Sequence, residues 1–148
     1  MLYIHRELEK EIQKFLQIFP VIAVTGPRQS GKSTLLKTIY KDNYKYVSFD
    51  DPLVGGFFDN DPQGFMKQHL DKVIFDEVQK YPRLLNYIKI AVDNDRQNYG
   101  KFILTGSSQF TLLSQMEMSR PFPSISVRIF PDNTVRTFPS RMVKKFPY

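Results

Sequence analysis

Apolar residues recur along this chain with two different periods, and the two periods alternate. From Ile4 to Phe19 they stand three or four positions apart with charged residues between them, which predicts an amphipathic helix ended by Pro20. Apolar or alternating runs at 21–25, 44–50, 72–77 and 101–108 predict strands. Helical spacing returns at 34–40 and 84–92, with a short helix at 64–69. Strands that alternate with helices predict an α/β fold with a mostly parallel sheet and right-handed crossovers.

The segment between the second and third predicted strands lacks such a pattern. The dipeptide Asp51-Pro52 is expected to close the strand, and Gly55, Gly56 and Pro62 then indicate an irregular connection.

Composition narrows the class of protein. The chain has 148 residues, enough for one domain with its own core, and it has no cysteine, which excludes a disulfide framework and a thiolate metal site. His5 and His69 have no partners at metal-ligand spacing. No apolar run approaches a membrane span, so the sequence predicts a cytoplasmic protein that does not associate with membranes.

The net charge of +6 is concentrated near the C-terminus. Residues 119–148 hold six basic residues and a single acidic one, whereas residues 1–118 are almost neutral. The excess positive charge therefore belongs to a tail and not to the alternating α/β part.

A phosphate-binding motif lies between the first predicted strand and the helix that follows it. Residues 26–33 fill the P-loop template G-x-x-x-x-G-K-[ST]. Glycines let main-chain N–H groups surround a phosphate, the lysine meets the β- and γ-phosphates, and the serine hydroxyl ligates Mg²⁺. The predicted nucleotide-binding residues are Gly26, Pro27, Arg28, Gln29, Ser30, Gly31, Lys32, Ser33 and Thr34. For Arg28, a solvent-facing role is an equal alternative.

Two carboxylates end the third predicted strand. Asp76 is placed to hold Mg²⁺ together with Ser33, and Glu77 to orient or deprotonate the water that attacks the γ-phosphate. The alternative is that both acids only cap the following helix. The P-loop upstream favours the catalytic interpretation. Asp50 and Asp51 could approach the nucleotide, but turn formation beside Pro52 explains them equally well.

Polar residues also follow the fourth predicted strand. Thr105, Ser107 and Ser108 are candidates for a sensor that touches the γ-phosphate or the attacking water, and the choice among them stays open. Ordinary turn chemistry around Gly106 is the alternative.

Three segments together resemble one family. Gly-Pro-Arg-Gln-Ser-Gly-Lys-Ser-Thr (26–34), Phe-Asp-Glu-Val-Gln-Lys-Tyr-Pro (75–82) and Ile-Leu-Thr-Gly-Ser-Ser-Gln-Phe (103–110) are similar to the AAA-like ATPases of bacteria and archaea. In that family a P-loop domain precedes an uncharacterised C-terminal domain. The resemblance implies a three-layer P-loop sandwich with strand order 5-1-4-3-2. It also implies ATP and Mg²⁺ as ligands, with Lys32 and Ser33 in Walker A, Asp76 and Glu77 in Walker B, and a sensor within 105–108.

The resemblance also implies hydrolysis of ATP, with Glu77 polarising water and an arginine finger borrowed from a neighbouring subunit of a homo-oligomer. The sequence leaves the family pattern after Leu113. We therefore expect a truncated ATPase domain at 1–114, a divergent tail at 115–148, a fifth strand that is absent or replaced, and impaired hydrolysis.

The tail contains an octad repeat of the form basic-x-Phe-Pro-x-x-x-Val, so that Phe122, Phe130, Phe138 and Phe146 recur at equal intervals. Three interpretations compete. The favoured one is a frame-shifted end without an evolved role. The second is a nucleic-acid-binding module in which arginines meet phosphates and phenylalanines stack on bases. The third is a hairpin, with arms at 125–130 and 134–138, that completes the sheet beside the first strand.

Overall fold

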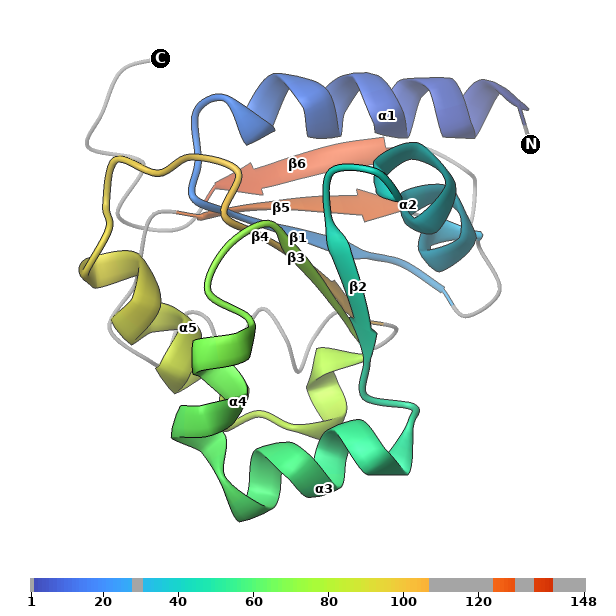
Figure 1. Ribbon diagram of the computed structural model, residues 1–148. Coiled ribbons are helices and arrows are strands. Elements are labelled where there is room, and N and C mark those ends of the chain that lie inside the picture. Colours follow the sequence, from blue (N-terminus) through green and yellow to red (C-terminus); the bar gives the residue numbers. More distant parts are fainter. Residues whose placement is uncertain (1, 28–30, 107–123, 130–134, 140–148) are drawn as a thin grey trace.

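A computed structural model describes residues 2–27, 31–106, 124–129 and 135–139 of the chain. It forms one mixed sheet with helices on both faces, and the sheet runs through the centre of the molecule (Figure 1). The elements in chain order are α1 (Leu2–Leu16), β1 (Val21–Thr25), α2 (Lys32–Tyr40), β2 (Lys45–Ser48), α3 (Pro52–Asn60), α4 (Pro62–Gln68), β3 (Val73–Asp76), a 3₁₀ turn η1 (Val78–Lys80), α5 (Leu84–Asp93), β4 (Phe102–Gly106), β5 (Ser124–Ile129) and β6 (Val135–Pro139).

The strands are ordered β2-β3-β4-β1-β5-β6. The first five are mutually parallel, and β6 pairs antiparallel with β5. Read from β5, this is the order 5-1-4-3-2 that the resemblance implied, with β6 added outside it. The fifth position, expected to be absent or replaced, is held by residues of the tail.

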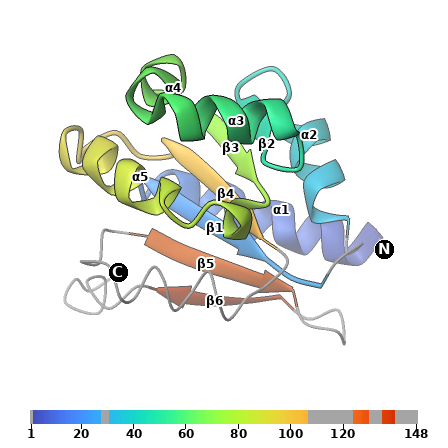
Figure 2. The ribbon, with the colours of Figure 1, turned by 90° about the horizontal axis from the view of Figure 1, so that it is seen from below.

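Two helical layers cover the sheet, which makes the predicted three-layer sandwich (Figure 2). Alternate residues of each strand face opposite layers, since side chains in a strand have a period of two. One core contains the buried side chains that α1 and α2 pack onto the sheet: Leu8, Ile12, Phe15, Leu35, Leu36, Ile22, Val24, Ile74 and Ile103. The other contains those of α3, α4 and α5: Phe58, Phe65, Leu84, Ile88, Val47, Phe75, Phe102 and Leu104.

The segment after Asp51-Pro52 is the main difference from the sequence-based expectation. It is not an irregular connection but helix α3. Asp51 is its N-cap and accepts a hydrogen bond of 2.9 Å from the Leu53 N–H, and Pro52 occupies the first turn, where its missing N–H costs nothing. Gly55 is buried beneath the ring of Tyr81, where a Cβ would lie 2.0 Å from the Tyr81 hydroxyl. The glycine therefore serves close packing within the helix and does not break it.

The tail contributes a β-hairpin to the sheet. β5 pairs with every residue of β1, from Val21↔Ser124 to Thr25↔Arg128. β6 pairs with β5 from Ile129↔Val135 to Ile125↔Pro139. The arms agree with the third interpretation of the tail to within one residue at each end.

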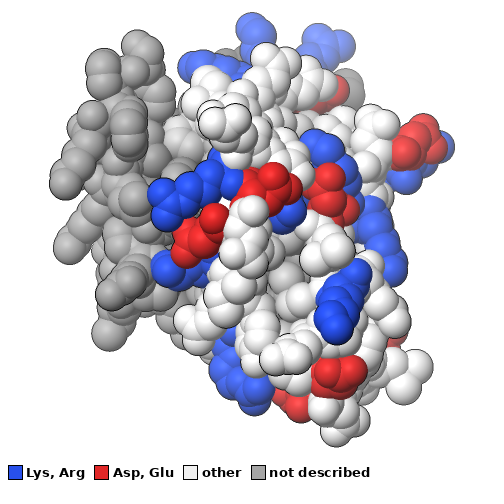
Figure 3. Space-filling model, turned by 60° about the vertical axis from the view of Figure 1, so that its left-hand side comes forward, with Lys and Arg blue, Asp and Glu red and all other residues white. Residues whose placement is uncertain are grey.

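Charged side chains on the face turned forward in Figure 3 are mixed in sign, with lysine and arginine beside aspartate and glutamate. Within the part of the chain that the structure describes, no helix is long and apolar enough to cross a membrane.

Candidate functional site

The site lies where the parallel strands β1, β2, β3 and β4 end. Their carboxyl ends meet at one edge of the sheet, as in other open α/β folds, where ligands bind beyond that edge. β1 ends at Thr25, and the predicted phosphate loop follows it directly. Thr25 is fully buried, and its hydroxyl has no hydrogen-bond partner among the described residues.

Gly31, the N-cap of α2, has φ 81° and ψ 7°. This left-handed conformation is accessible to glycine at no steric cost, which explains the second glycine of the motif. Helix α2 begins at the next residue, so its first N–H groups face the loop. Arg28, Gln29 and Ser30 lie outside the described residues, whereas Gly26, Pro27 and Thr34 lie within them.

Lys32 is almost completely buried, with 4% of its surface exposed. Its ammonium group donates a hydrogen bond of 3.3 Å to the carbonyl oxygen of Pro27, on the opposite side of the loop. A lysine is rarely buried to this extent, because removing its charge from water is costly unless a partner is present. The cationic side chain of Lys32 is therefore held by a contact with the start of the loop.

Asp76, at the end of β3, is the centre of the polar network at this edge. Its Oδ1 atom accepts hydrogen bonds from the hydroxyls of Ser33, at 2.9 Å, and Thr105. Its Oδ2 atom accepts from the hydroxyls of Tyr46 and Ser48, the latter at 3.4 Å. Asp76 is 5% exposed, and the four donors belong to α2, β2 and β4.

The ionisation of Asp76 follows from these contacts. Burial alone would raise its pKa, but the hydrogen bonds from Thr105, Tyr46, Ser33 and Ser48 together lower the pKa below the usual value for aspartate. The pKa of Tyr46 is raised, first by burial and then by its hydrogen bond to the carboxylate. At neutral pH the site therefore contains a buried anion surrounded by neutral hydroxyls.

Glu77 has a left-handed backbone, with φ 58° and ψ 44°. This conformation is uncommon for residues other than glycine, and such residues cluster at functional sites. Its N–H donates a hydrogen bond of 3.2 Å to the Thr105 hydroxyl, and its Oε2 atom accepts one from the Gln79 side chain. The strained turn directs the glutamate side chain away from the path of the strand.

Thr105 links the Asp76 carboxylate to the backbone of Glu77. Its hydroxyl donates to Asp76 and accepts from the backbone of Glu77, and the side chain is fully buried. Of the three sensor candidates it is the only one within the described residues; Ser107 and Ser108 lie outside them.

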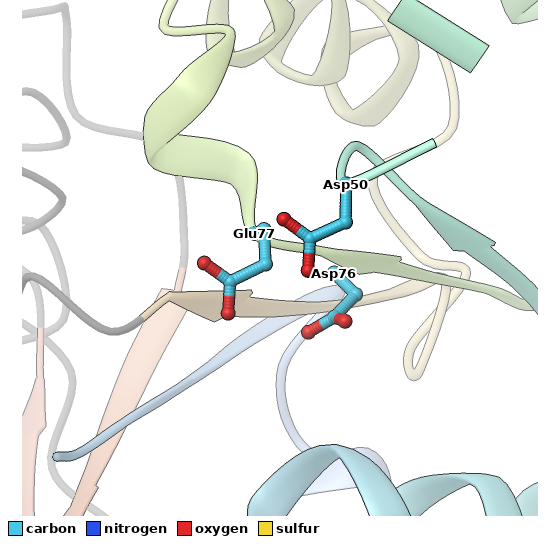
Figure 4. A group of neighbouring side chains, drawn as sticks. All are labelled: Asp50, Asp76 and Glu77. Carbon is cyan, nitrogen blue, oxygen red and sulfur yellow. The ribbon is translucent and has the colours of Figure 1, made fainter. Parts of the chain in front are cut away.

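Three carboxylates could supply oxygen ligands to a cation. One oxygen from each of Asp50, Asp76 and Glu77 lies within 4.8 Å of the others, at the ends of β2 and β3 (Figure 4). Asp50 is exposed and is also paired with Lys80. Carboxylate and hydroxyl oxygens are the ligands that Mg²⁺ prefers, so the donor set around Asp76 fits that ion.

Sequence reasoning brought Ser33, Asp76 and Thr105 to one place, and it missed Tyr46, Ser48 and Gln79. Tyr46 and Ser48 are polar residues two apart on β2 with Val47 between them, which places them on one face. That alternation was a usable signal. No sequence pattern pointed to Gln79, because its position depends on a 3₁₀ turn that follows the left-handed backbone of Glu77.

Residues 19–133 match the model of a family described as an AAA domain. The match extends beyond residue 114, at which sequence reasoning placed the end of the ATPase domain; that boundary stays a prediction.

Curated relatives include uncharacterized proteins of Mycobacterium bovis and Mycobacterium tuberculosis. Each is 27% identical over 108 residues, which is 73% of this chain and 24% of the relative. The chain therefore spans about a quarter of the length of these relatives.

Solved structures with a similar chain path include a DNA replication initiation factor (16% identity, TM-score 0.46, 70% of this chain and 36% of that one) and PCH-2 of C. elegans (19%, 0.45, 88% and 41%). A third is the ORC2 protein of Aeropyrum pernix (14%, 0.40, 86% and 46%). With TM-scores below 0.5, these likenesses add nothing to the assignment.

Proposed function

The chain belongs to the family of AAA domains, and on that premise we propose that it binds ATP at the loop 26–34, with Mg²⁺ between Ser33 and Asp76. The loop amides and the first turn of α2 would receive the phosphates, and Lys32 would neutralise the β- and γ-phosphate charge. Nucleotide binding is what the family supports; the particular residues are our proposal.

A single contact carries the proposal. The Ser33 hydroxyl lies 2.9 Å from Asp76 Oδ1, which joins the end of the phosphate loop to the tip of β3. A chance Gly/Ser-rich turn would not require a buried carboxylate at this point. Four hydroxyl donors keep that carboxylate ionised, so it is available to a cation.

Ser33 and Asp76 would hold the Mg²⁺ ion, with Asp50 and Glu77 near enough to bind its water ligands. When bound, the ion would neutralise charge on the phosphates and hold them in position. The hydroxyls of Tyr46, Ser48 and Thr105 would keep the Asp76 side chain in place, because they fix both of its oxygens.

We further propose that the domain hydrolyses ATP, with Glu77 as the group that polarises the attacking water. The hydrogen bond from the Glu77 backbone to Thr105 supports this role, because it fixes where the side chain starts. Gln79 holds Oε2 and leaves the other carboxylate oxygen to the water. An arginine finger from a neighbouring subunit of a homo-oligomer is part of this proposal. The cytoplasmic location expected from the sequence stays a prediction.

Replacement of Lys32 with alanine tests ATP binding. We expect binding of a fluorescent ATP analogue, followed by anisotropy, to be lost in Lys32→Ala and kept in Lys37→Ala, which removes an exposed lysine from the same helix. Far-ultraviolet circular dichroism would show whether both variants are folded. Equal affinity in Lys32→Ala and the unaltered chain would refute the assignment of the loop.

A second proposal, nucleic-acid binding, rests on the basic octads of the tail. Deleting the tail would be a poor test, because β5 pairs with β1. A triple change of Arg128, Arg136 and Arg141 to glutamine keeps the strands and removes charge. We expect single-stranded DNA binding that weakens steeply with salt in the unaltered chain and is lost in the triple variant. Absence of binding at low salt would contradict this proposal.

A further inference from the structure

The open edge of the sheet at β2 has features of a docking site. Among the strands that the structure describes, β2 is the last of the sheet, and β3 is its neighbour on the inner side. The N–H of Lys45 donates to Lys72 and that of Phe49 donates to Asp76, both toward β3. In a parallel ladder alternate residues face opposite sides, so Tyr46 and Ser48 direct their backbone groups away from β3, and the Ser48 carbonyl there already accepts a hydrogen bond of 3.2 Å from the Asp51 N–H.

A hollow lies on each face of the sheet next to this edge. The hollow on the α2 face has a volume of about 390 Å³ and a floor of Leu36 and Ile74. The hollow on the α3–α4 face has a volume of about 470 Å³ and is lined by Val47, Val54 and Phe57. Lys45 and Tyr46 line both hollows, so the two meet at β2.

The two hollows differ in chemistry. The one on the α2 face is lined by Lys37, Lys41 and Lys45, and no acidic residue in the described ranges lines it. The one on the α3–α4 face is mainly apolar, and Leu53 at its side is 82% exposed. A single exposed leucine is ordinary on a protein surface, but beside this hollow it enlarges the apolar area that a partner would cover.

We infer that the β2 edge binds an extended protein segment in which acidic and apolar residues alternate. Such a segment would add a strand to the sheet through the N–H and C=O of Tyr46 and the N–H of Ser48. Successive side chains would then point to opposite faces, so acidic ones would meet Lys37 and Lys41 while apolar ones would meet Leu53 and its neighbours. The alternation is the same for a parallel and an antiparallel strand.

Charge favours this partner over a second copy of the chain. A two-fold axis through the edge would pair β2 with β2 and bring the lysines beside the α2-face hollow against their counterparts. Like charges placed opposite one another across an interface are unfavourable. An acidic segment reverses the sign of that interaction.

The test uses the full chain and a fluorescent eight-residue peptide that alternates aspartate with leucine. Fluorescence anisotropy should show saturable binding that weakens with salt. Two relatives of the peptide test the mode of binding. One has methyl groups on alternate amides, which block strand pairing, and the other has the same composition with aspartates and leucines in separate blocks. Both should bind at least about tenfold more weakly.

Two variants of the chain test the site. Leu53→Asp and Lys41→Glu should each weaken peptide binding by about tenfold or more, since they remove an apolar contact and reverse a charge. Ile90→Asp and Lys10→Glu make the same changes at exposed positions on α5 and α1 and should leave peptide binding unchanged.

Several results would overturn the inference. The first is the absence of peptide binding. The second is binding of the methylated or block peptide that is as tight as that of the alternating peptide. The third is a loss of peptide binding in the control variants as large as in Leu53→Asp and Lys41→Glu. Sedimentation that shows self-association of the chain, lost in Leu53→Asp, would assign the edge to a second copy instead. ATP affinity is read separately, so the inference stands or falls independently of the proposed nucleotide site.

Discussion

The Ser33 hydroxyl donates a 2.9 Å hydrogen bond to Asp76 Oδ1 across 43 residues of sequence. Ser33 stands in the first turn of α2 and Asp76 ends β3, so the contact joins two segments that β1 and β3 bring to one edge of the sheet. The residues that the proposed function assigns to Mg²⁺ are thus in direct contact with each other.

Ser33→Ala should separate the metal from the nucleotide. It removes a proposed Mg²⁺ ligand but leaves the loop amides and Lys32, so we expect ATP affinity in the presence of Mg²⁺ to fall about tenfold, equivalent to about 1.4 kcal/mol. ATP affinity in EDTA should hardly change. Titration calorimetry under both conditions measures this, with Ser33→Thr as the conservative control. An equal loss in EDTA would contradict the assignment.

Thr105→Val should destabilise the site although the two side chains have nearly the same shape. Valine cannot accept from the Glu77 N–H or donate to Asp76, and an unsatisfied buried polar group costs about 1–3 kcal/mol. We expect a loss of that size in the free energy of unfolding, measured with urea, and slower ATP turnover. Thr105→Ser keeps the hydroxyl and should recover most of both. Unaltered stability in the valine variant would remove Thr105 from the network.

Glu77→Gln should keep ATP binding and stop turnover. The amide cannot accept a proton from water, so we expect the rate of phosphate release to fall on the order of 100-fold or more. The affinity for ATP, measured separately, should stay within about twofold, which corresponds to about 0.4 kcal/mol. Glu11→Gln makes the same change on α1 and serves as the control. Similar turnover in Glu77→Gln and the unaltered chain would exclude Glu77 as the catalytic group.

Alkaline pH should unfold the edge of the sheet beside α2. Burial, and then the nearby Asp71, raise the pKa of Tyr44 from 10.0 to about 12, and its hydroxyl donates a 2.5 Å hydrogen bond to the Gly100 carbonyl. A raised pKa means that the folded state favours the protonated phenol. This contribution to stability is complete below pH 10 and is lost as the pH rises through 12.

Urea unfolding at a series of alkaline pH values measures this effect. Tyr44→Phe should lose about 1 kcal/mol at neutral pH, the value of one hydrogen bond, and should show a shallower decline above pH 10. The burial of Tyr40 and Tyr46 raises their pKa in the same direction, so a residual decline should remain. An identical pH dependence in both proteins would contradict the burial argument.

The sheet was predictable from sequence because its central strands are buried on both faces. Residues 21–24 are an unbroken apolar run that precedes a P-loop motif, and the run before Asp76 is similar. Parallel strands covered on both faces have this signature, and their shared carboxyl edge follows from topology. That is why Ser33, Asp76 and Thr105 could be brought together without coordinates.

Features that depend on side-chain packing were not predictable in the same way. Asp51-Pro52 is compatible with a turn and with the start of a helix, and burial of Gly55 against Tyr81 decides for the helix. The bond from Tyr46 to Asp76 depends on the register of β2 against β3, in which Ser48 stands opposite Asp76. Local sequence does not specify that register.

The pairing of β5 with β1 has a consequence for handling the protein. Val21–Thr25 is buried at every position, and β5 occupies one of its two sides. A proteolytic cut that released the chain from residue 124 onward would leave these residues as a bare template for intermolecular strand growth. Precipitation after such a cut would therefore indicate that β1 had lost its pairing with β5, even with the nucleotide loop intact.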